Sequence, residues 1–194
     1  MAAKTSVSRF DKLKKEIELL LLNSPNGREL VHARLTLKWV LKLKPDAGEV
    51  LMIAALSHDI ERTITGITER TLKGSMNQDK YVAFKKKHSV RSAKIICKLL
   101  EKRSYPKSII NEINHLVKNH EFGGDEETGI LTDSDSLAYF EHNIPSYLKG
   151  YGKNKTKKKI KFMYKRMSSR AKGLVSKIKY RDKRIASLVE QNTS

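Results

Sequence analysis

Residues 50–62 read VLMIAALSHDIER, an apolar run that ends in a histidine and a carboxylate. A helix that is apolar nearly all round is normally buried, so this stretch predicts a central helix, from Asp46 to the His58-Asp59 pair, in an all-α fold. Asp46 and Glu49 are expected to open it as a capping box. His58 and Asp59 are strong metal ligands, and the dipole at a helix C-terminus favours a cation there. The dipeptide alone is weak evidence, so a metal site also requires partners from elsewhere in the chain.

Apolar residues recur at three- and four-residue steps through most of the remaining chain, which predicts further helices. They are expected at about residues 10–21, 28–43, 81–102, 106–120, 125–144 and 155–189. Ser104 is expected to cap the helix that starts near residue 106, and Asp125 the next one. Pro145 and the Gly150–Gly152 segment are expected to end the helix that Asp125 opens. The polar connection from Glu61 to Tyr81 is expected to be irregular apart from a short helical turn.

The composition is typical of one helical domain. Pro and Gly are sparse, and 194 residues suffice for a single core. The only cysteine, Cys97, rules out an intramolecular disulfide and is expected to pack in that core. No apolar stretch reaches the roughly 18 residues of a membrane span, and the N-terminus lacks the apolar region of a signal peptide. The protein is therefore expected to be cytoplasmic, without a membrane span.

The formal net charge is +19, and it is concentrated in the C-terminal quarter of the chain. From Gly150 onward, fifteen Lys and Arg residues face only Asp182 and Glu190, a balance of +13. Such a segment attracts phosphates, whether in nucleic acid, nucleotides or anionic lipid, although a solvated Lys-rich helix face has the same composition. Residues 151–194 are expected to form a basic helical extension packed on the same domain, in which Arg166 and Arg170 share a face.

Candidate metal ligands occur in a particular order along the chain, each on a different predicted helix or helix end: His32, His58, Asp59, His88, His120 and Asp135. Helical folds build metal sites in this way, with side chains from several helices converging. Mixed imidazole and carboxylate ligands suit Mn, Fe, Co, Ni or Zn better than Mg. Only one of Asp133 and Asp135 is expected to face inward, because they are two residues apart. His115 and His142 are not expected in the site.

With this order, the chain resembles the HD superfamily of metal-dependent phosphohydrolases, over roughly Leu30 to Pro145. The resemblance also rests on residues 119–125, NHEFGGD, which lead into residues 131–137, LTDSDSL. The second segment is similar to the Asp-Ala-Asp-x-Leu segment of that family, with Ser134 in place of the usual Ala. The resemblance implies an HD-domain-like helical bundle over residues 1–150, to which the basic C-terminal segment is added.

The resemblance also implies roles for single residues. It assigns the primary metal site to His32, His58, Asp59 and Asp135. In two-metal members Asp59 would bridge the ions and His88 and His120 would bind the second one; in one-metal members those two histidines would contact the substrate phosphate. The implied catalytic residues are Asp59, His88 and His120, and the implied activity is cleavage of a phosphomonoester or phosphodiester, a nucleotide among them, by metal-activated water.

Cationic side chains near these ligands are expected to meet a substrate phosphate. They are Arg62 and Arg91, together with Arg70 and Lys73 in the polar connection, for which a merely solvated loop is an equal alternative. Glu61 or Glu121 is expected to orient water or a ligating histidine. Lys85, Lys86 and Lys87 are expected to be solvated. The alternative function is that of a nucleic-acid- or nucleotide-binding protein whose metal site is structural or vestigial.

Overall fold

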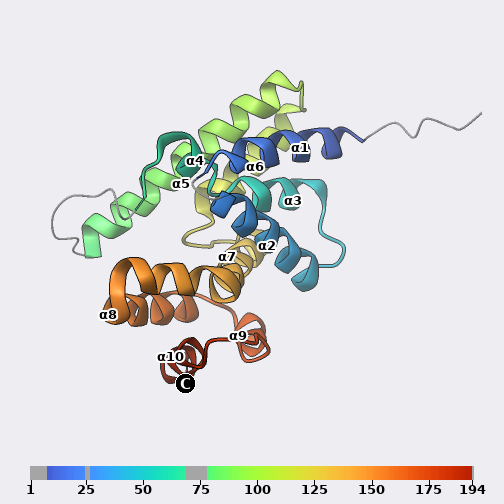
Figure 1. Ribbon diagram of the computed structural model, residues 1–194. Helices are drawn as coiled ribbons and strands as arrows, with labels where there is room; N and C mark the ends of the chain where they lie inside the picture. The colour runs from blue at the N-terminus through green and yellow to red at the C-terminus, as the bar shows by residue number, and fades with distance from the viewer. Residues whose placement is uncertain (1–7, 25–26, 69–77, 194) are drawn as a thin grey trace, which may run out of the picture.

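The computed structural model describes residues 8–24, 27–68 and 78–193, and every regular element in these ranges is helical. In chain order the elements are α1 (Arg9–Leu22), α2 (Arg28–Leu43), α3 (Glu49–Ser57), α4 (Ile60–Thr65), α5 (Gln78–Lys102), α6 (Lys107–Asn119), α7 (Glu126–Ala138), the π-helical turn η3 (Tyr139–Asn143), α8 (Ile144–Lys165), α9 (Ser169–Val175) and α10 (Lys183–Thr193). Figure 1 shows α1, α2, α3, α5 and α6 in one group and α8, α9 and α10 in another, with α7 between them. The all-α fold is confirmed.

Helix α3 is central, as its uniformly apolar sequence predicts. It contacts α1, α2, α5, α6 and α7. Six of its nine residues, Leu51 and Ile53 to Ser57, are buried. The predicted capping box is wrong, because Gly48 precedes the helix and no side chain caps it. The Glu49 carboxylate instead accepts a hydrogen bond from the Tyr105 hydroxyl at 2.8 Å.

Two other boundaries depend on local backbone geometry. Helix α6 begins after Pro106, and Ser104 does not cap it; the φ of Ser104 is 53°, in the left-handed region. Asp125 caps α7 as predicted, and Thr128 completes the capping box from the third helical position. The connection after Glu61 contains α4, and α5 begins three residues before the predicted start.

The predicted break at Pro145 is wrong. After α7 the chain passes through η3 directly into α8, and Pro145 lies in the first turn of α8. The predicted break at Gly150–Gly152 is confirmed, because Gly152 has a non-helical backbone (φ 75°, ψ 174°) and divides α8 into two helical segments joined at a kink. Insertions of π-helix are frequent at functional sites, and η3 places Asn143 beside His32.

The apolar core has two parts. The first lies among α1 to α7, and Cys97 packs against its edge, half-buried. The second joins Trp39 of α2 and Leu137 of α7 to Ile160 of α8 and Leu188 of α10. Helices α2 and α7 contribute to both parts, so they connect the C-terminal helices to the rest of the fold.

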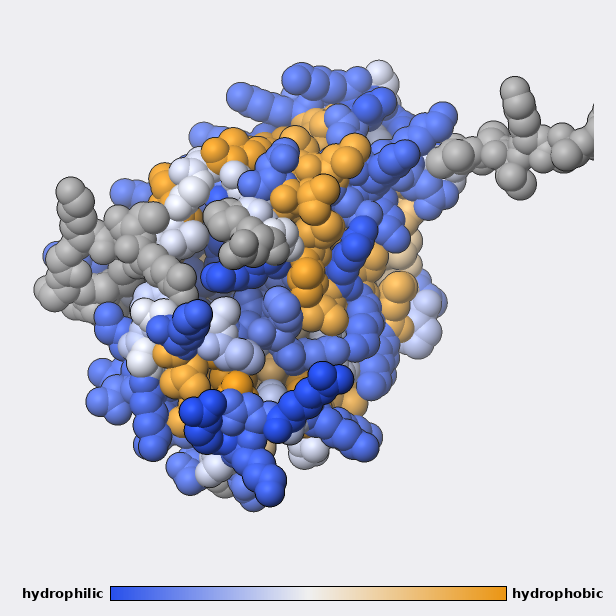
Figure 2. All heavy atoms as spheres, viewed as in Figure 1, coloured by the Kyte–Doolittle hydropathy of each residue, from blue (hydrophilic) through white to orange (hydrophobic). Residues whose placement is uncertain are grey.

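The surface has both polar and apolar areas. Figure 2 shows hydrophilic side chains over much of the visible face and a hydrophobic band across its middle. Among the residues that the structure describes, no helix is both long and apolar enough to cross a membrane.

Candidate metal centre

Six predicted ligands and one further carboxylate come together where α2, α3, α5, α6 and α7 meet. They form two clusters that share Asp59. The first cluster consists of His32, His58, Asp59 and Asp135, and the second of Asp59, His88, His120 and Glu121. All seven side chains are buried.

In the first cluster, four atoms from α2, α7 and the α3–α4 junction converge. The Nε2 atoms of His32 and His58 are 3.3 Å apart. Oδ1 of Asp135 lies 3.0 Å from Nε2 of His32 and 3.8 Å from that of His58. Oδ2 of Asp59 lies 3.8 Å and 3.7 Å from the same two nitrogens.

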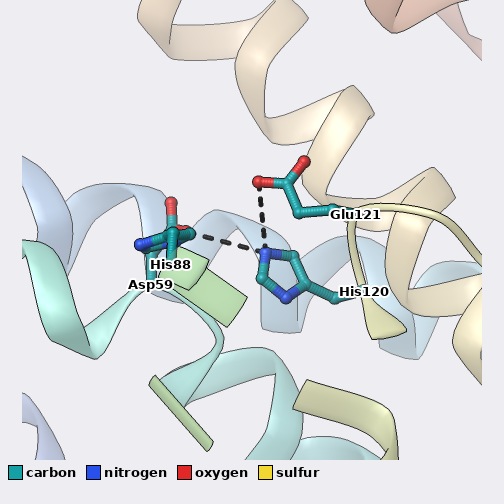
Figure 3. Close-up of side chains that lie close together, drawn as sticks. All are labelled: Asp59, His88, His120 and Glu121. Carbon is teal, nitrogen blue, oxygen red and sulfur yellow. Dashed lines mark hydrogen bonds and ion pairs between the residues drawn. The ribbon is translucent and has the colours of Figure 1, made fainter. Parts of the chain in front are cut away.

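The second cluster lies on the other side of Asp59. Oδ1 of Asp59 is 2.7 Å from Nε2 of His88 and 3.8 Å from Nε2 of His120. Oε1 of Glu121 is 3.5 Å from the same His120 nitrogen. Figure 3 shows the imidazole of His120 with this nitrogen turned toward both carboxylates. Asp59 therefore presents one oxygen to each cluster.

Each of the four histidines is held in one orientation by its other ring nitrogen. Nδ1 of His58 and Nδ1 of His120 lie 2.9 Å and 2.7 Å from the carbonyl oxygens of Ala55 and Val117, three residues earlier in the chain. Nδ1 of His32 lies 3.1 Å from Oδ1 of Asn143, and Nδ1 of His88 lies 2.6 Å from Oε2 of Glu61. These oxygens are acceptors, so each Nδ1 donates, and each Nε2 would offer a lone pair to a cation once it carries no proton. Acceptors behind the ring are typical of metal-ligating histidines.

The separations between these atoms fit a bound cation. With bonds of about 2.1 Å, two ligands of one ion are about 3.0 Å apart at an octahedral angle and about 3.4 Å apart at a tetrahedral one. The distances of 3.0–3.8 Å in the first cluster are close to these values. In the second cluster, Nε2 of His120 is buried and makes no hydrogen bond to a described residue. A buried nitrogen without such a partner is expected where a ligand binds.

Electrostatics keeps the carboxylates of the clusters ionised. Burial alone would raise the pKa of Asp59, Glu121 and Asp135, but neighbouring Arg, Lys and His side chains hold all three pKa values well below the usual range. Burial would likewise lower the pKa of His58, but Asp59 and Asp135 outweigh it and raise the pKa to about 9. The pKa of His120 is lowered, chiefly by burial. Ionised carboxylates and neutral imidazoles are the forms that ligate metals, so a cation bound in the first cluster would displace the proton of His58.

Four cations surround the clusters and pair with the three cluster carboxylates and with Glu61. Arg62 donates to Oδ2 of Asp59, Lys85 lies 2.5 Å from Oε1 of Glu121, and Nη2 of Arg166 lies 2.5 Å from Oδ2 of Asp135. Arg91 pairs with Glu61 at 2.8 Å. The prediction that Lys85 is solvated is wrong, because Lys85 is buried against Glu121.

A pocket of about 120 Å³ adjoins the first cluster, and its lining includes His32 and Asp135. Four cations and three tyrosines also line it: Arg28, Arg62, Lys85, Lys159, Tyr139, Tyr147 and Tyr151. The rings of Tyr147 and Tyr151 are stacked, with centroids 4.3 Å apart. The pocket offers positive charge and aromatic surface directly beside the carboxylates.

The remaining candidates lie elsewhere. Arg91 is not among the pocket residues, and Arg70 and Lys73 fall outside the described residues. His115 is at the surface, paired with Asp125. Asp133 points away from the clusters, as expected for one of the two α7 aspartates, and accepts hydrogen bonds from Ser168.

Comparison with known proteins gives a family but no characterised relative. A family model described as "Domain of unknown function (DUF4202)" matches residues 7–189. The chain belongs to this family. No curated protein and no solved structure matches significantly. The DUF4202 match spans both clusters and most of the C-terminal basic segment, including Arg166.

Besides Lys85, two members of this site were not predicted as such from the sequence, Glu121 and Arg166. Glu121 was expected only to orient water or a histidine, although its position directly after His120 at a helix end marks it as a possible ligand. Arg166 was expected to share a face with Arg170, but Arg166 follows α8 and is largely buried, whereas Arg170 is exposed on α9. No sequence signal links Arg166 to carboxylates 31 and 45 residues earlier.

Proposed function

We propose that this DUF4202 protein is a metal-dependent phosphohydrolase of the HD type. One observation carries the proposal. Four buried histidines, each with Nδ1 against an oxygen acceptor, direct Nε2 toward ionised carboxylates in two clusters, and Asp59 belongs to both clusters. Imidazole and carboxylate donors favour Mn, Fe, Co, Ni or Zn. The first cluster would hold one divalent cation and the second cluster another.

The charge balance supports a phosphorylated substrate. The four carboxylates around the clusters are already matched by Arg62, Lys85, Arg91 and Arg166. A divalent cation bound there leaves an excess of positive charge, which favours an anionic ligand over a neutral one. When bound, such a cation activates water and neutralises charge on a phosphoryl group.

The pocket beside the first cluster provides groups for that anion. Arg28 lines it and makes no hydrogen bond or ion pair with another described residue, so its guanidinium can take a phosphate oxygen. Arg62 also lines the pocket, next to Asp59, and its positive charge can stabilise negative charge that develops on the phosphoryl group. Glu61 holds His88 in place, so we assign Glu61 a supporting role.

Metal analysis of the purified protein and a panel of phosphomonoesters and phosphodiesters test the proposal. We expect bound divalent metal, and cleavage with added Mn²⁺, Co²⁺ or Ni²⁺. The variant His58→Ala should lose cleavage and the cation of the first cluster, whereas His115→Ala, a surface histidine outside the clusters, should keep cleavage and both cations. A wild-type protein that binds no divalent ion and cleaves none of the esters would contradict the proposal.

A second candidate function is binding of a nucleic acid or a nucleotide, with a structural or vestigial metal site. The stacked Tyr147 and Tyr151 favour it, since bases stack on aromatic side chains and lysines bind phosphates. Exposed lysines occur along the same helix, α8, as at Lys153 and Lys158. Single-stranded oligonucleotides should then bind with steep salt dependence, and Tyr151→Ala should weaken binding while His58→Ala leaves it unchanged. Absence of a gel shift at low salt would exclude this function for nucleic acid.

A further inference from the structure

Arg166 is a buried guanidinium that contacts both clusters. It directly follows α8, and its side chain is only 11% exposed. Its Nη2 donates to Oδ2 of Asp135 at 2.5 Å, and its Nη1 donates to Oε2 of Glu121 at 3.1 Å. Its Nε donates to Oγ of Ser136 at 2.8 Å. All three guanidinium nitrogens therefore have fixed acceptors.

In each of these two carboxylates, one oxygen bonds to Arg166 and the other faces a histidine. Oδ2 of Asp135 is bonded to Arg166, and Oδ1 faces His32 at 3.0 Å. Oε2 of Glu121 is bonded to Arg166, and Oε1 faces His120 at 3.5 Å. Arg166 thus restrains one carboxylate in the first cluster and another in the second, where Lys85 also donates to Oε1 of Glu121 at 2.5 Å.

Arg166 is itself held in register with α7. Two residues further on, the backbone amide and hydroxyl of Ser168 donate to the two carboxylate oxygens of Asp133, at 2.8 Å and 2.5 Å. Asp133 therefore binds Ser168, and Asp135 binds Arg166. The two acceptors are two residues apart on α7, and the two donors are two residues apart after α8. The guanidinium also lies 5.8 Å from the ring centre of Phe162. Contacts with Phe162, before Arg166, and of Ser168, after it, therefore hold this segment in place.

We propose that Arg166 is a positioning residue for both metal clusters, so that the C-terminal segment takes part in building the site. This inference rests on the proposed function, in which both clusters bind divalent metal. Arg166 acts through Asp135 and Glu121, which it holds with one oxygen toward the histidines. A lysine cannot replace it, because a single ammonium group lacks the planar fork that reaches three separate acceptors.

Metal affinities of variants test the inference independently of activity. Metal-stripped wild type, Arg166→Ala and Arg166→Lys would be titrated with Co²⁺ and followed by absorbance and calorimetry. The matched control is Arg170→Ala, which removes the same charge from an exposed position four residues away. Loss of an outer hydrogen-bond partner of a metal ligand typically lowers metal affinity about 10–100-fold. We expect losses of this size at both sites in Arg166→Ala, smaller but measurable losses at both in Arg166→Lys, and none in Arg170→Ala.

Guanidinium ion added to Arg166→Ala should restore part of the affinity at both sites, a response that a purely structural role would not produce. Arg166→Ala with wild-type affinities, or with a loss at one site only, would overturn the inference and leave the proposed function intact. If Arg166→Ala does not fold, Arg166→Lys decides, because it keeps the buried charge; wild-type affinities in that variant would overturn the inference. A wild-type protein that binds no Co²⁺ would overturn the proposed function and the inference together.

Discussion

Replacing the shared carboxylate by the variant Asp59→Asn should remove most of the thermal stabilisation that metal ions give this protein. Asp59 offers Oδ2 to the first cluster and Oδ1 to the second, so its charge serves both. Asparagine keeps the size of the side chain and removes its negative charge. The variant therefore separates the contribution of the shared ligand from that of packing.

The expected magnitude follows from the number of clusters and the chain length. A ligand at a hundredfold excess over its dissociation constant stabilises the folded state by about 2.7 kcal/mol per site. For 194 residues the entropy of unfolding is about 0.4 kcal/mol/K, so one site raises the melting temperature by about 7 °C and two sites by about 13 °C.

Scanning calorimetry of metal-stripped protein, before and after addition of Mn²⁺ or Co²⁺, measures these shifts within each variant. Asp135→Asn affects only the first cluster and should keep about half of the wild-type shift. Asp59→Asn should keep little of it, and His115→Ala should keep all of it. A full shift in Asp59→Asn, or a saturating wild-type shift that corresponds to one site, would refute the shared two-cluster centre.

Three further outcomes are expected. Phe140→Ala should lower the free energy of unfolding by about 3–5 kcal/mol in urea titrations, because Phe140 is completely buried in the second part of the core. Trp39→Phe should cost about 1–2 kcal/mol in the same assay, since it removes the 2.7 Å hydrogen bond from the indole to Glu141. The pKa of Asp125 is lowered, first by the hydrogen bond from the Thr128 amide, so its contribution to stability is present above an unfolded-state pKa of about 4 and is lost as the pH falls through the folded-state value. Urea titrations across that range should show a larger acid loss in the wild type than in Asp125→Asn, and equal losses would contradict this account.

The helices, the central position of α3 and the ligand order could all be predicted, because each depends on local pattern. Helical periodicity is a property of neighbouring residues, and α2 has the predicted bounds. The uniformly apolar run before His58 requires burial wherever it packs. The placement of ligands on separate helix ends then follows from their spacing along the chain.

Boundaries were less predictable, because competing local choices have similar free energies. Gly48 and Pro106, rather than Asp46 and Ser104, precede their helices, and Glu49 bonds to Tyr105 instead of to its own helix. Pro145 lies in the first turn of α8 and does not end the helix, although proline was expected to break it there.

The helical fold, the position of the central helix and the candidate histidines and aspartates can all be read from the sequence. The division of these ligands into two clusters around Asp59, and the addition of Glu121, Lys85 and Arg166, follow only from how the helices pack. These three depend on contacts across 31 to 45 residues. Burial beside a group of opposite charge, which no local pattern encodes, is what distinguishes them from the other charged residues of the chain.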